Sequence, residues 1–288
     1  MLVIVGYVIV LGSVFGGFAL AGGHLGAIYQ PVELLIIGGA AFGAFVVGNP
    51  VKTLKATLKA LPGLLKGSRY SKAMYLELMG MLYDILTKVR KEGLMAIERD
   101  IENPKESPLF AAYPKLLPDH HLIEFLTDYL RLMVSGNLNA HEIEALMDSE
   151  IETHHHEGVI PAHALQKTAD GLPAFGIVAA VMGVVHTMAS VGLPPSELGQ
   201  LIAHALVGTF LGVLLAYGFV GPLASLLEQK LAESTKMLQC VKVTLLASLN
   251  GYAPAIAVEF GRKVLYSSER PSFAEMEEHV KHRKTRGA

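Results

Sequence analysis

The residues with the most chemical meaning lie in two apolar stretches, 172–192 and 198–222, which contain no Asp, Glu, Lys or Arg. Each stretch is long enough to cross a bilayer. Their polar groups and helix breakers are Pro173, His186, His204, Thr209, Tyr217 and Pro222. Hydroxyl groups inside a membrane bundle can line an ion path, but they are weak proton acceptors. The pattern therefore predicts an ion path whose titrating acid is supplied by a partner protein.

Four of these residues also have purely structural interpretations. Thr209 and Tyr217 are eight residues apart, about two helical turns. A Thr hydroxyl can line a water path, orient a partner's carboxyl group or simply bond its own helix. Pro173 and Pro222 are expected near the cytoplasmic ends of the two stretches, at matching depth. There they either permit a hinge or mark a helix end.

The composition assigns the chain to the membrane proteins. Of its 288 residues, 51% are hydrophobic and 17% are charged, and the mean hydropathy is +0.41. The net charge of −2 gives no electrostatic footprint for nucleic acid. Cys240 is the single cysteine, which excludes an internal disulfide framework and a cysteine-based metal cage. It is expected to pack between helices.

Two further apolar stretches, 1–22 and 32–48, complete a set of four predicted transmembrane helices. The first has no basic residue and is too long for the core of a signal peptide. The second has Glu33 at its outer edge and ends at Asn49-Pro50. Each of the four contains small residues four apart, which favour close helix packing within or between copies. These pairs are Gly12 and Gly16, Gly39 and Gly43, Gly176 and Ala180, and Gly208 and Gly212.

Lys and Arg are unevenly distributed around these stretches. The loops 23–31 and 193–197 have none, whereas 51–170 has 14 and the segment after Pro222 has 10 of the chain's 24. By the positive-inside rule, both long segments and both termini lie in the cytoplasm. We therefore predict an all-α membrane protein with four transmembrane helices and a large helical cytoplasmic domain. The predicted divisions are 1–50 and 171–222 for the transmembrane helices, 51–170 for the cytoplasmic helical domain, and 223–288 for a cytoplasmic helical extension with a basic tail.

Helical periodicity dominates the two charged segments, and no stretch sustains the alternation that a strand requires. An apolar stripe predicts one helix over 71–100 that ends at Asn103-Pro104. A second stripe over 226–249 predicts that the fourth transmembrane helix continues into the cytoplasm, with a kink at Pro222. Residues 281–288 are basic and are expected to be disordered.

Two groups of charged or ionisable residues remain. Arg90 and Glu98 are expected two turns apart on the long cytoplasmic helix, where exposed charges either form a solvated face or set the register with a moving partner. His154–His156 and His163 could bind a metal, but adjacent residues on a helix point in different directions, so we expect a solvated run. His186 and His204 are functional candidates because they lie within membrane stretches, although a neutral imidazole can equally bond a neighbouring carbonyl.

No phosphate-binding loop, dinucleotide-binding motif or Ser-His-Asp order is present, so the sequence does not indicate an enzyme. No metal or cofactor is expected.

Several longer strings carry a family resemblance across nearly the whole chain. The chain resembles the MotA family of flagellar motor stator subunits, within the MotA/TolQ/ExbB proton channel group. The matching strings are ERDIENPKES (98–107), DYLRL (128–132), EIEALMD (142–148), LPAFGIVAAVMGVVH (172–186), IAHALVGTFLGVLLAYGF (202–219) and NGYAPAIAVEFGRKVLYSSERPSF (250–273). The loop 190–196 departs from the family pattern, which we expect to have little consequence.

The resemblance implies an assembly and its partners. It implies a bacterial inner-membrane protein that forms a ring, thought to contain five copies, around two copies of MotB. The proton acceptor would be an Asp on the membrane helix of MotB. Arg90 and Glu98 match the family's charged pair that engages the rotor protein FliG.

The resemblance also assigns roles within the membrane. Pro173 and Pro222 match the prolines that couple ion passage to movement of the cytoplasmic part. Thr209 and Tyr217 fall in the motif that faces the ion path. Sodium-driven relatives carry Thr where this chain has Ala180, which implies that the transported ion here is a proton.

Three other functions compete with a stator. An energiser of outer-membrane processes, like ExbB or TolQ, would have three membrane spans, so four spans and the string ERDIENP argue against it. A self-contained cation transporter needs an acid in its own spans, where only Glu33, at an edge, is available. A passive membrane scaffold predicts that Thr209 and Pro173 tolerate substitution.

Overall fold

The computed structural model describes residues 2–189 and 192–286, and every regular element in these ranges is helical. Four helical stretches are long and apolar enough to cross a membrane. These findings confirm the predicted all-α class with four transmembrane helices. In the loop 190–196, Ser190 and Val191 lie outside the described residues.

Contacts divide the chain into two compact units. The first, here called the apolar unit, contains residues 1–67 and 158–230, and the second, the polar unit, contains residues 68–157 and 231–288. The predicted divisions at residues 50, 170 and 222 mark where the chain enters or leaves the membrane. The division by contacts does not test them, so they stay predictions.

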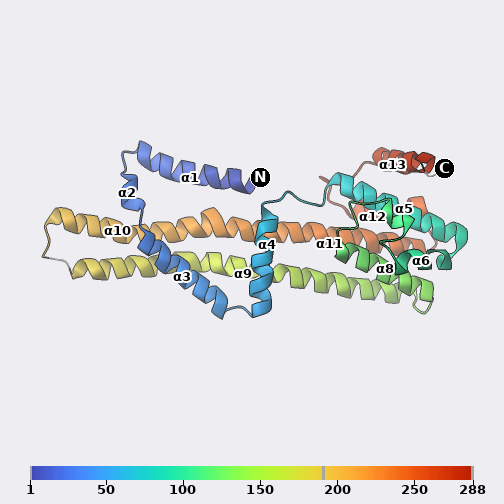
Figure 1. The fold of residues 1–288 in the computed structure, drawn as a ribbon, viewed down its shortest axis with the longest axis horizontal. Helices are drawn as coiled ribbons and strands as arrows, with labels where there is room; N and C mark the ends of the chain where they lie inside the picture. The colour runs from blue at the N-terminus through green and yellow to red at the C-terminus, as the bar shows by residue number, and fades with distance from the viewer. Residues whose placement is uncertain (1, 190–191, 287–288) are drawn as a thin grey trace. The chain divides into compact units, whose positions relative to one another are not determined.

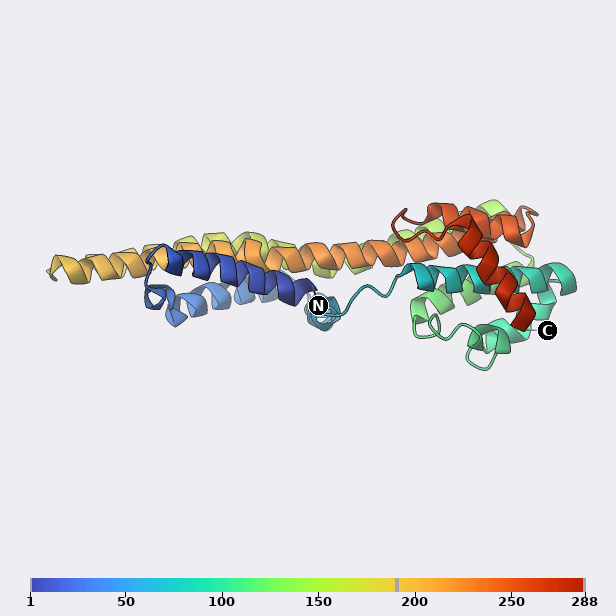
Figure 2. The ribbon, with the colours of Figure 1, turned by 90° about the horizontal axis from the view of Figure 1, so that it is seen from above.

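The apolar unit is built around a hairpin of two long helices. Its elements are α1 (Leu2–Leu20), α2 (Leu25–Ile28), α3 (Pro31–Val47), α4 (Val51–Leu64), the later part of α9 (Ala140–Met188), α10 (Pro195–Val213), the π-helix η2 (Leu214–Val220) and the start of α11 (Gly221–Leu249). The antiparallel helices α9 and α10 lie side by side, and their loop end extends beyond α1, α2 and α3 (Figures 1 and 2). Lys230 caps the C-terminal end of α4: its Nζ donates to the carbonyl oxygens of Gly63 and Lys66 at 2.7 and 2.6 Å.

Glycines allow the backbones of α9 and α10 to approach closely. A Cβ added to Gly176 would lie 2.7 Å from the Gly208 oxygen, and one added to Gly212 would lie 2.7 Å from the Leu172 oxygen. The predicted use of small residues is therefore confirmed for this helix pair, within one chain. In contrast, Cβ atoms added to the predicted pairs of α1 and α3 would meet nothing within 4 Å, at Gly12, Gly16, Gly39 and Gly43.

The polar unit surrounds a core rich in aromatic side chains. Its elements are α5 (Lys72–Glu92), the 3₁₀ helix η1 (Leu94–Ile97), α6 (Glu98–Glu102), α7 (Pro108–Ala111), α8 (His120–Ser135), the start of α9, the end of α11, α12 (Pro254–Val264) and α13 (Phe273–Arg286). Its largest fully buried side chains include Tyr75, Phe110 and Tyr113. The predicted stripe of α5 is buried at Leu78, Leu82 and the residues between them.

Two predicted boundaries in the polar unit are wrong. The helix expected over 71–100 ends at Glu92, because Gly93 has a φ of 89°, which an α-helix cannot contain. The basic tail expected to be disordered is helical as far as Arg286, while residues 287 and 288 lie outside the described range. A capping box begins this helix: the Glu275 amide donates to Ser272 Oγ, and the Ser272 amide donates to Glu275 Oε2 at 2.7 Å.

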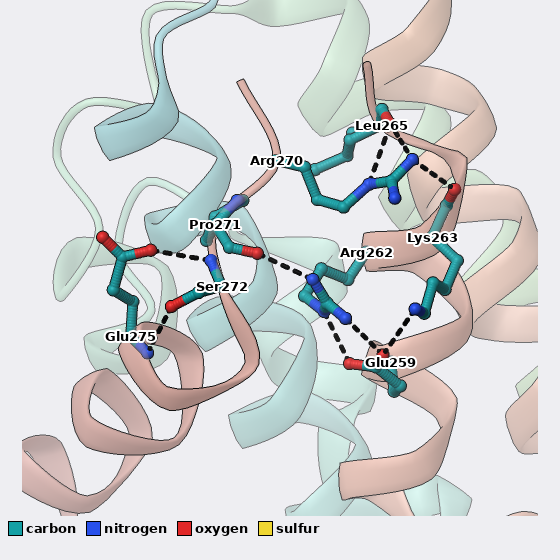
Figure 3. Close-up of polar contacts among 8 residues, drawn as sticks. All are labelled: Glu259, Arg262, Lys263, Leu265, Arg270, Pro271, Ser272 and Glu275. Carbon is teal, nitrogen blue, oxygen red and sulfur yellow. Dashed lines mark hydrogen bonds and ion pairs between the residues drawn. The ribbon is translucent and has the colours of Figure 1, made fainter. Parts of the chain in front are cut away.

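A buried arginine holds the segment between α12 and α13 (Figure 3). Arg262 is 7% exposed and donates to both carboxylate oxygens of Glu259 at 2.6 Å and to the Pro271 oxygen at 2.8 Å. The hydrogen bonds from Arg262 hold the pKa of Glu259 below its ordinary value. Arg270 adds a bond to the Leu265 oxygen at 2.7 Å. These bonds satisfy a charge that would otherwise be costly to bury.

Gly212→Ala tests the close approach of α9 and α10. Its new methyl group would meet the backbone at Leu172 and Gly176, which cannot yield as a flexible side chain would. We expect a loss of about 1–3 kcal/mol, as for overpacked cores. The measurement is thermal unfolding of the purified protein by circular dichroism. Gly39→Ala, where nothing lies within 4 Å, is the control, and equal melting of the two variants would contradict the packing argument.

Arg262→Lys tests the clamp between α12 and α13. Lys keeps the charge but cannot make the paired bond, so we expect a loss of roughly 1–3 kcal/mol at neutral pH. Because the folded-state pKa of Glu259 is lowered, the stabilisation is present above its ordinary value of 4.5 and is lost as the pH falls through the folded-state value. The difference from the unmodified protein should therefore shrink on acidification. Lys263→Gln removes only a 3.9 Å contact to Glu259 and is the control.

Candidate functional site

The hairpin brings two of the predicted ion-path residues to the same level. The backbone nitrogen of Ala180 would lie 3.0 Å from a Cβ on Gly208, and Thr209 follows Gly208 directly. Thr209 is half-buried, and within the part of the chain that the structure describes its hydroxyl makes no bond to its own helix. Thr168 and Thr187 do make such bonds, each at 2.9 Å. Among the described residues, Thr209 therefore has a hydroxyl that is not bonded to its own helix, beside the close contact of Gly208 with Ala180.

Tyr217 lies in a different environment from Thr209. Its residue is 68% exposed on η2, and eight residues separate it from Thr209. That spacing corresponds to about 12 Å along an α-helix. Its side chain is therefore available to a neighbouring molecule rather than to the interior of the hairpin.

The π-helix η2 is a feature that the sequence analysis missed. Pro222 has no N–H group and cannot donate to the carbonyl four residues earlier. The chain instead widens before it, where the Gly221 amide donates to the Ala216 oxygen five residues earlier. Tyr7 of α1 also donates to the Phe219 oxygen at 3.1 Å. The sequence analysis expected a kink at Pro222. The helix is indeed irregular there, but the irregularity is a π-helix that begins at Leu214.

Pro173 and Pro222 do not lie at matching depth, so this part of the prediction is wrong. The contacts of Gly176 with Gly212 and of Ala180 with Gly208 set the register of the antiparallel hairpin, so Pro173 is opposite residue 215, just after the end of α10. Pro222 comes seven residues after residue 215, on α11. Seven residues of helix span about 10 Å. The two prolines therefore perturb the hairpin at separate levels.

Glu33 is a candidate that the sequence analysis placed at an edge. Its Oε2 atom is buried and has no hydrogen-bond partner in the described residues. The same atom would lie 3.0 Å from a Cβ on Gly208, close to Ala180. Its signal in the sequence was an acid in an apolar stretch, but only the helix packing shows that it reaches the hairpin.

In the polar unit, Arg90 and Glu98 lie on two separate helices. Arg90 is in the last turn of α5 and Glu98 begins α6, with Gly93 turning the chain between them. The prediction of a single helix is wrong, for the reason given above. Both side chains are exposed, and within the described ranges neither takes part in an ion pair.

A buried acid fixes the segment that carries Glu98. Asp100 accepts bonds from Lys88 Nζ at 2.7 Å and from Ser107 Oγ at 2.6 Å. Burial alone would raise the pKa of Asp100, but these hydrogen bonds outweigh it and hold the pKa below its ordinary value. Ser107 also accepts from the Leu109 amide and so begins α7. This network ties α5, α6 and α7 together.

The histidine run forms separate contacts rather than one site. The His154 ring lies 3.4 Å from Ser234 Oγ and 5.4 Å from the ring of His121, between centroids. His155 lies 3.3 Å from Thr235, and His156 lies 3.5 Å from Glu152. Burial lowers the pKa of His154, with the charge of His121 acting in the same direction. In the ranges described, no group of three potential ligands converges on a metal position.

Comparison with known proteins gives a family assignment. Residues 4–93 match the motility protein A N-terminal family, and residues 119–240 match the MotA/TolQ/ExbB proton channel family. Motility protein A of Salmonella typhimurium is 63% identical over 281 residues, which cover 98% of this chain and 95% of that protein. Motility protein A of Escherichia coli is 62% identical with the same coverage. Chemotaxis protein LafT of Vibrio parahaemolyticus is 40% identical, covering 94% and 95%.

Two solved structures share the fold. MotAB of C. jejuni has a TM-score of 0.78 at 21% identity, covering 94% of this chain and 98% of the other. The flagellar MotAB stator complex of Bacillus subtilis has a TM-score of 0.73 at 24% identity, covering 89% and 92%.

The fold and the four apolar helices define a helical membrane protein. The sequence matches extend over both units. The chain belongs to the motility protein A family, within the MotA/TolQ/ExbB proton channel family.

Asp100→Asn tests whether the buried acid positions Glu98. Asn cannot pair with the charge of Lys88, so we expect a loss of about 1–3 kcal/mol. Faster hydrogen exchange of backbone amides in 97–107, together with a lower melting temperature, is the expected result. Glu106→Gln, which alters an exposed acid in the same segment, should change neither quantity. Unchanged exchange in Asp100→Asn would show that the segment is held by other contacts.

Proposed function

We propose that the chain is a stator subunit of the bacterial flagellar motor. With MotB it forms a proton-conducting complex that converts proton motive force into torque on the rotor. The observation that carries this proposal is the 63% identity to motility protein A over nearly the full length of both chains. The match of residues 4–93 to the motility protein A N-terminal family favours a stator over an energiser like ExbB or TolQ.

The proposed assembly is a ring of copies, taken as five, around two copies of MotB in the bacterial inner membrane. Both termini lie in the cytoplasm, as the distribution of Lys and Arg indicates. MotB supplies the Asp that titrates, since 172–192 and 198–222 contain no acid. Ala180, in place of the Thr of sodium-driven relatives, supports the proton as the transported ion. No cofactor takes part.

The proposed mechanism couples protonation to a change in helix fit. Moving one elementary charge through the membrane potential releases about 2.3 kcal/mol per 100 mV. Neutralising the MotB acid removes the cost of a charge at membrane depth, and the fit with the surrounding helices then changes. The missing N–H of Pro173 in α9, and the π-helix between α10 and α11 before Pro222, are two places where the helices can yield at different levels. Arg90 and Glu98 carry the change to FliG.

Swimming of a strain that lacks its own stator subunit tests the proposal. The unmodified chain, expressed with MotB, should restore swimming. Reversing both charges, Arg90→Glu with Glu98→Lys, should lower swimming speed to roughly half or less, because like charges at an interface repel. Compensating reversals in FliG should restore it. The exposed pair Lys105→Glu with Glu106→Lys is the control for a change of surface charge alone. Full swimming of the reversed variant would remove the rotor contact from Arg90 and Glu98.

A further inference from the structure

Among the described residues of the apolar unit, Glu33 is the acid from outside the central hairpin that packs against it. It lies in the first turn of α3, and its Oε2 atom is buried without a hydrogen-bond partner in the residues described. The carboxyl group fills the space beside Gly208, where a Cβ would lie 3.0 Å from Oε2, 3.0 Å from the Ala180 nitrogen and 3.1 Å from the Ala179 Cβ. It therefore lies where α3, α9 and α10 meet.

This position is well inside the apolar length of the hairpin. Gly208 is 13 residues after Pro195, the first residue of α10, and Ala179 is nine residues before Met188, the last residue of α9. At the rise of an α-helix these intervals are about 20 and 14 Å. Figures 1 and 2 show the same relation, since the loop end of the hairpin extends beyond α3. Glu33 is in the first turn of α3, but its carboxyl group contacts α9 and α10 well away from the loop end of the hairpin.

In the residues that the structure describes, the two apolar stretches that form the hairpin offer no fixed cation to neutralise this acid, because 172–192 and 198–222 contain no Lys or Arg. Within the apolar unit, the packed elements carry these titratable residues: His163, Lys167, Asp170 and His186 on α9, Glu197 and His204 on α10, and His24 and Tyr29 beside α2. His204 is one turn before Gly208, whereas Lys167 and Asp170 are 12 and nine residues before Ala179, about 18 and 14 Å along the helix. None forms an ion pair with Glu33 among the described residues. A carboxylate in such a site is costly unless it takes up a proton.

We propose that Glu33 is a second proton-binding group of the complex, on the path toward the acid of the partner. A proton forms an O–H bond at the Glu33 carboxylate, and that bond breaks when the proton moves on, leaving the carboxylate as it was. Gly208 leaves room for the carboxyl group, because a Cβ at this position would lie within 3.1 Å of Glu33 Oε2, the Ala180 nitrogen and the Ala179 Cβ. Ala180 and Thr209 lie beside this position on α9 and α10. The transfer of the proton from Glu33 toward the partner's acid rests on the proposed function. The binding of a proton by Glu33 does not depend on that function.

Chemical labelling tests the proton-binding site without measuring motility. Dicyclohexylcarbodiimide, an apolar reagent, reacts with protonated carboxyl groups in membranes. In membranes that contain the complex with MotB, it should label the peptide of Glu33 at pH 7, whereas a water-soluble carbodiimide should label Glu197 instead. The expected difference is about tenfold or more between the two acids with the apolar reagent. Labelling of Glu33 only in strong acid, or equal labelling of both acids, would overturn the inference.

Substitution tests the role of this site in ion passage. Glu33→Gln should assemble with MotB but lower swimming speed about twofold or more, with a larger effect at external pH 8 than at pH 6. Glu33→Asp, which keeps the acid, should retain most of the speed, and the matched change Glu197→Gln should have no effect. Equal speeds of Glu33→Gln and the unmodified chain at every pH would remove Glu33 from the path.

The two proposals fail in different ways. If the unmodified chain does not support swimming, the stator function is wrong, while the labelling result still decides whether Glu33 binds a proton. If Glu33→Gln does not co-purify with MotB, its swimming speed reports failed assembly. The labelling experiment on the unmodified chain then decides whether Glu33 binds a proton. Normal swimming of the unmodified chain with unlabelled Glu33 would leave the stator function intact and overturn the further inference.

Discussion

The close contact between the backbones of α9 and α10 is the constraint on which the apolar unit depends. In lipid, apolar side chains gain little by leaving one apolar environment for another, so helix association relies on close packing. Here the contact is made by Gly176, Gly208 and Gly212, whose missing side chains bring backbone atoms together. The contact fixes which residues are opposite one another. It sets Ala180 beside Gly208 and leaves the space that the Glu33 carboxyl group occupies.

The polar unit depends on a different constraint. Some of its charged side chains are buried and held by hydrogen bonds, while others are exposed on its surface. Asp100 and Arg262 are buried, and each is satisfied by an opposite charge and a further hydrogen bond. Such pairs add little net stability over apolar packing, but breaking one is costly, so they specify a local conformation. The exposed Arg90 and Glu98 lie at the ends of helices that Asp100 helps to hold. Their spacing is therefore a property of the fold rather than of one helix.

Much of this architecture could be predicted because it depends on local periodicity. The four apolar helices, the buried stripe of α5 and the small residues of the hairpin follow from residue spacing alone. The break at Gly93 could not be predicted in the same way, since the apolar stripe continues through Ile97 and only the positive φ of Gly93 ends the helix. The unequal depths of Pro173 and Pro222 also could not be predicted, because they depend on the register of two antiparallel helices. Glu33 looked peripheral because its own helix begins two residues earlier.

The position of Glu33 changes the meaning of the acid-free stretches. An ion path is formed by side chains from several elements in space, so a stretch without acids does not define a path without them. If a proton moves from water to its acceptor in one step, it must cross the low-dielectric interior of the membrane as an unpaired charge. Such a charge is costly in that environment. A carboxyl group beside Ala180 and Gly208 would divide that transfer into two shorter steps, each ending on an oxygen atom. The chain would then supply both the walls of the path and its first acceptor, while the partner's acid remains the group whose neutralisation moves the helices.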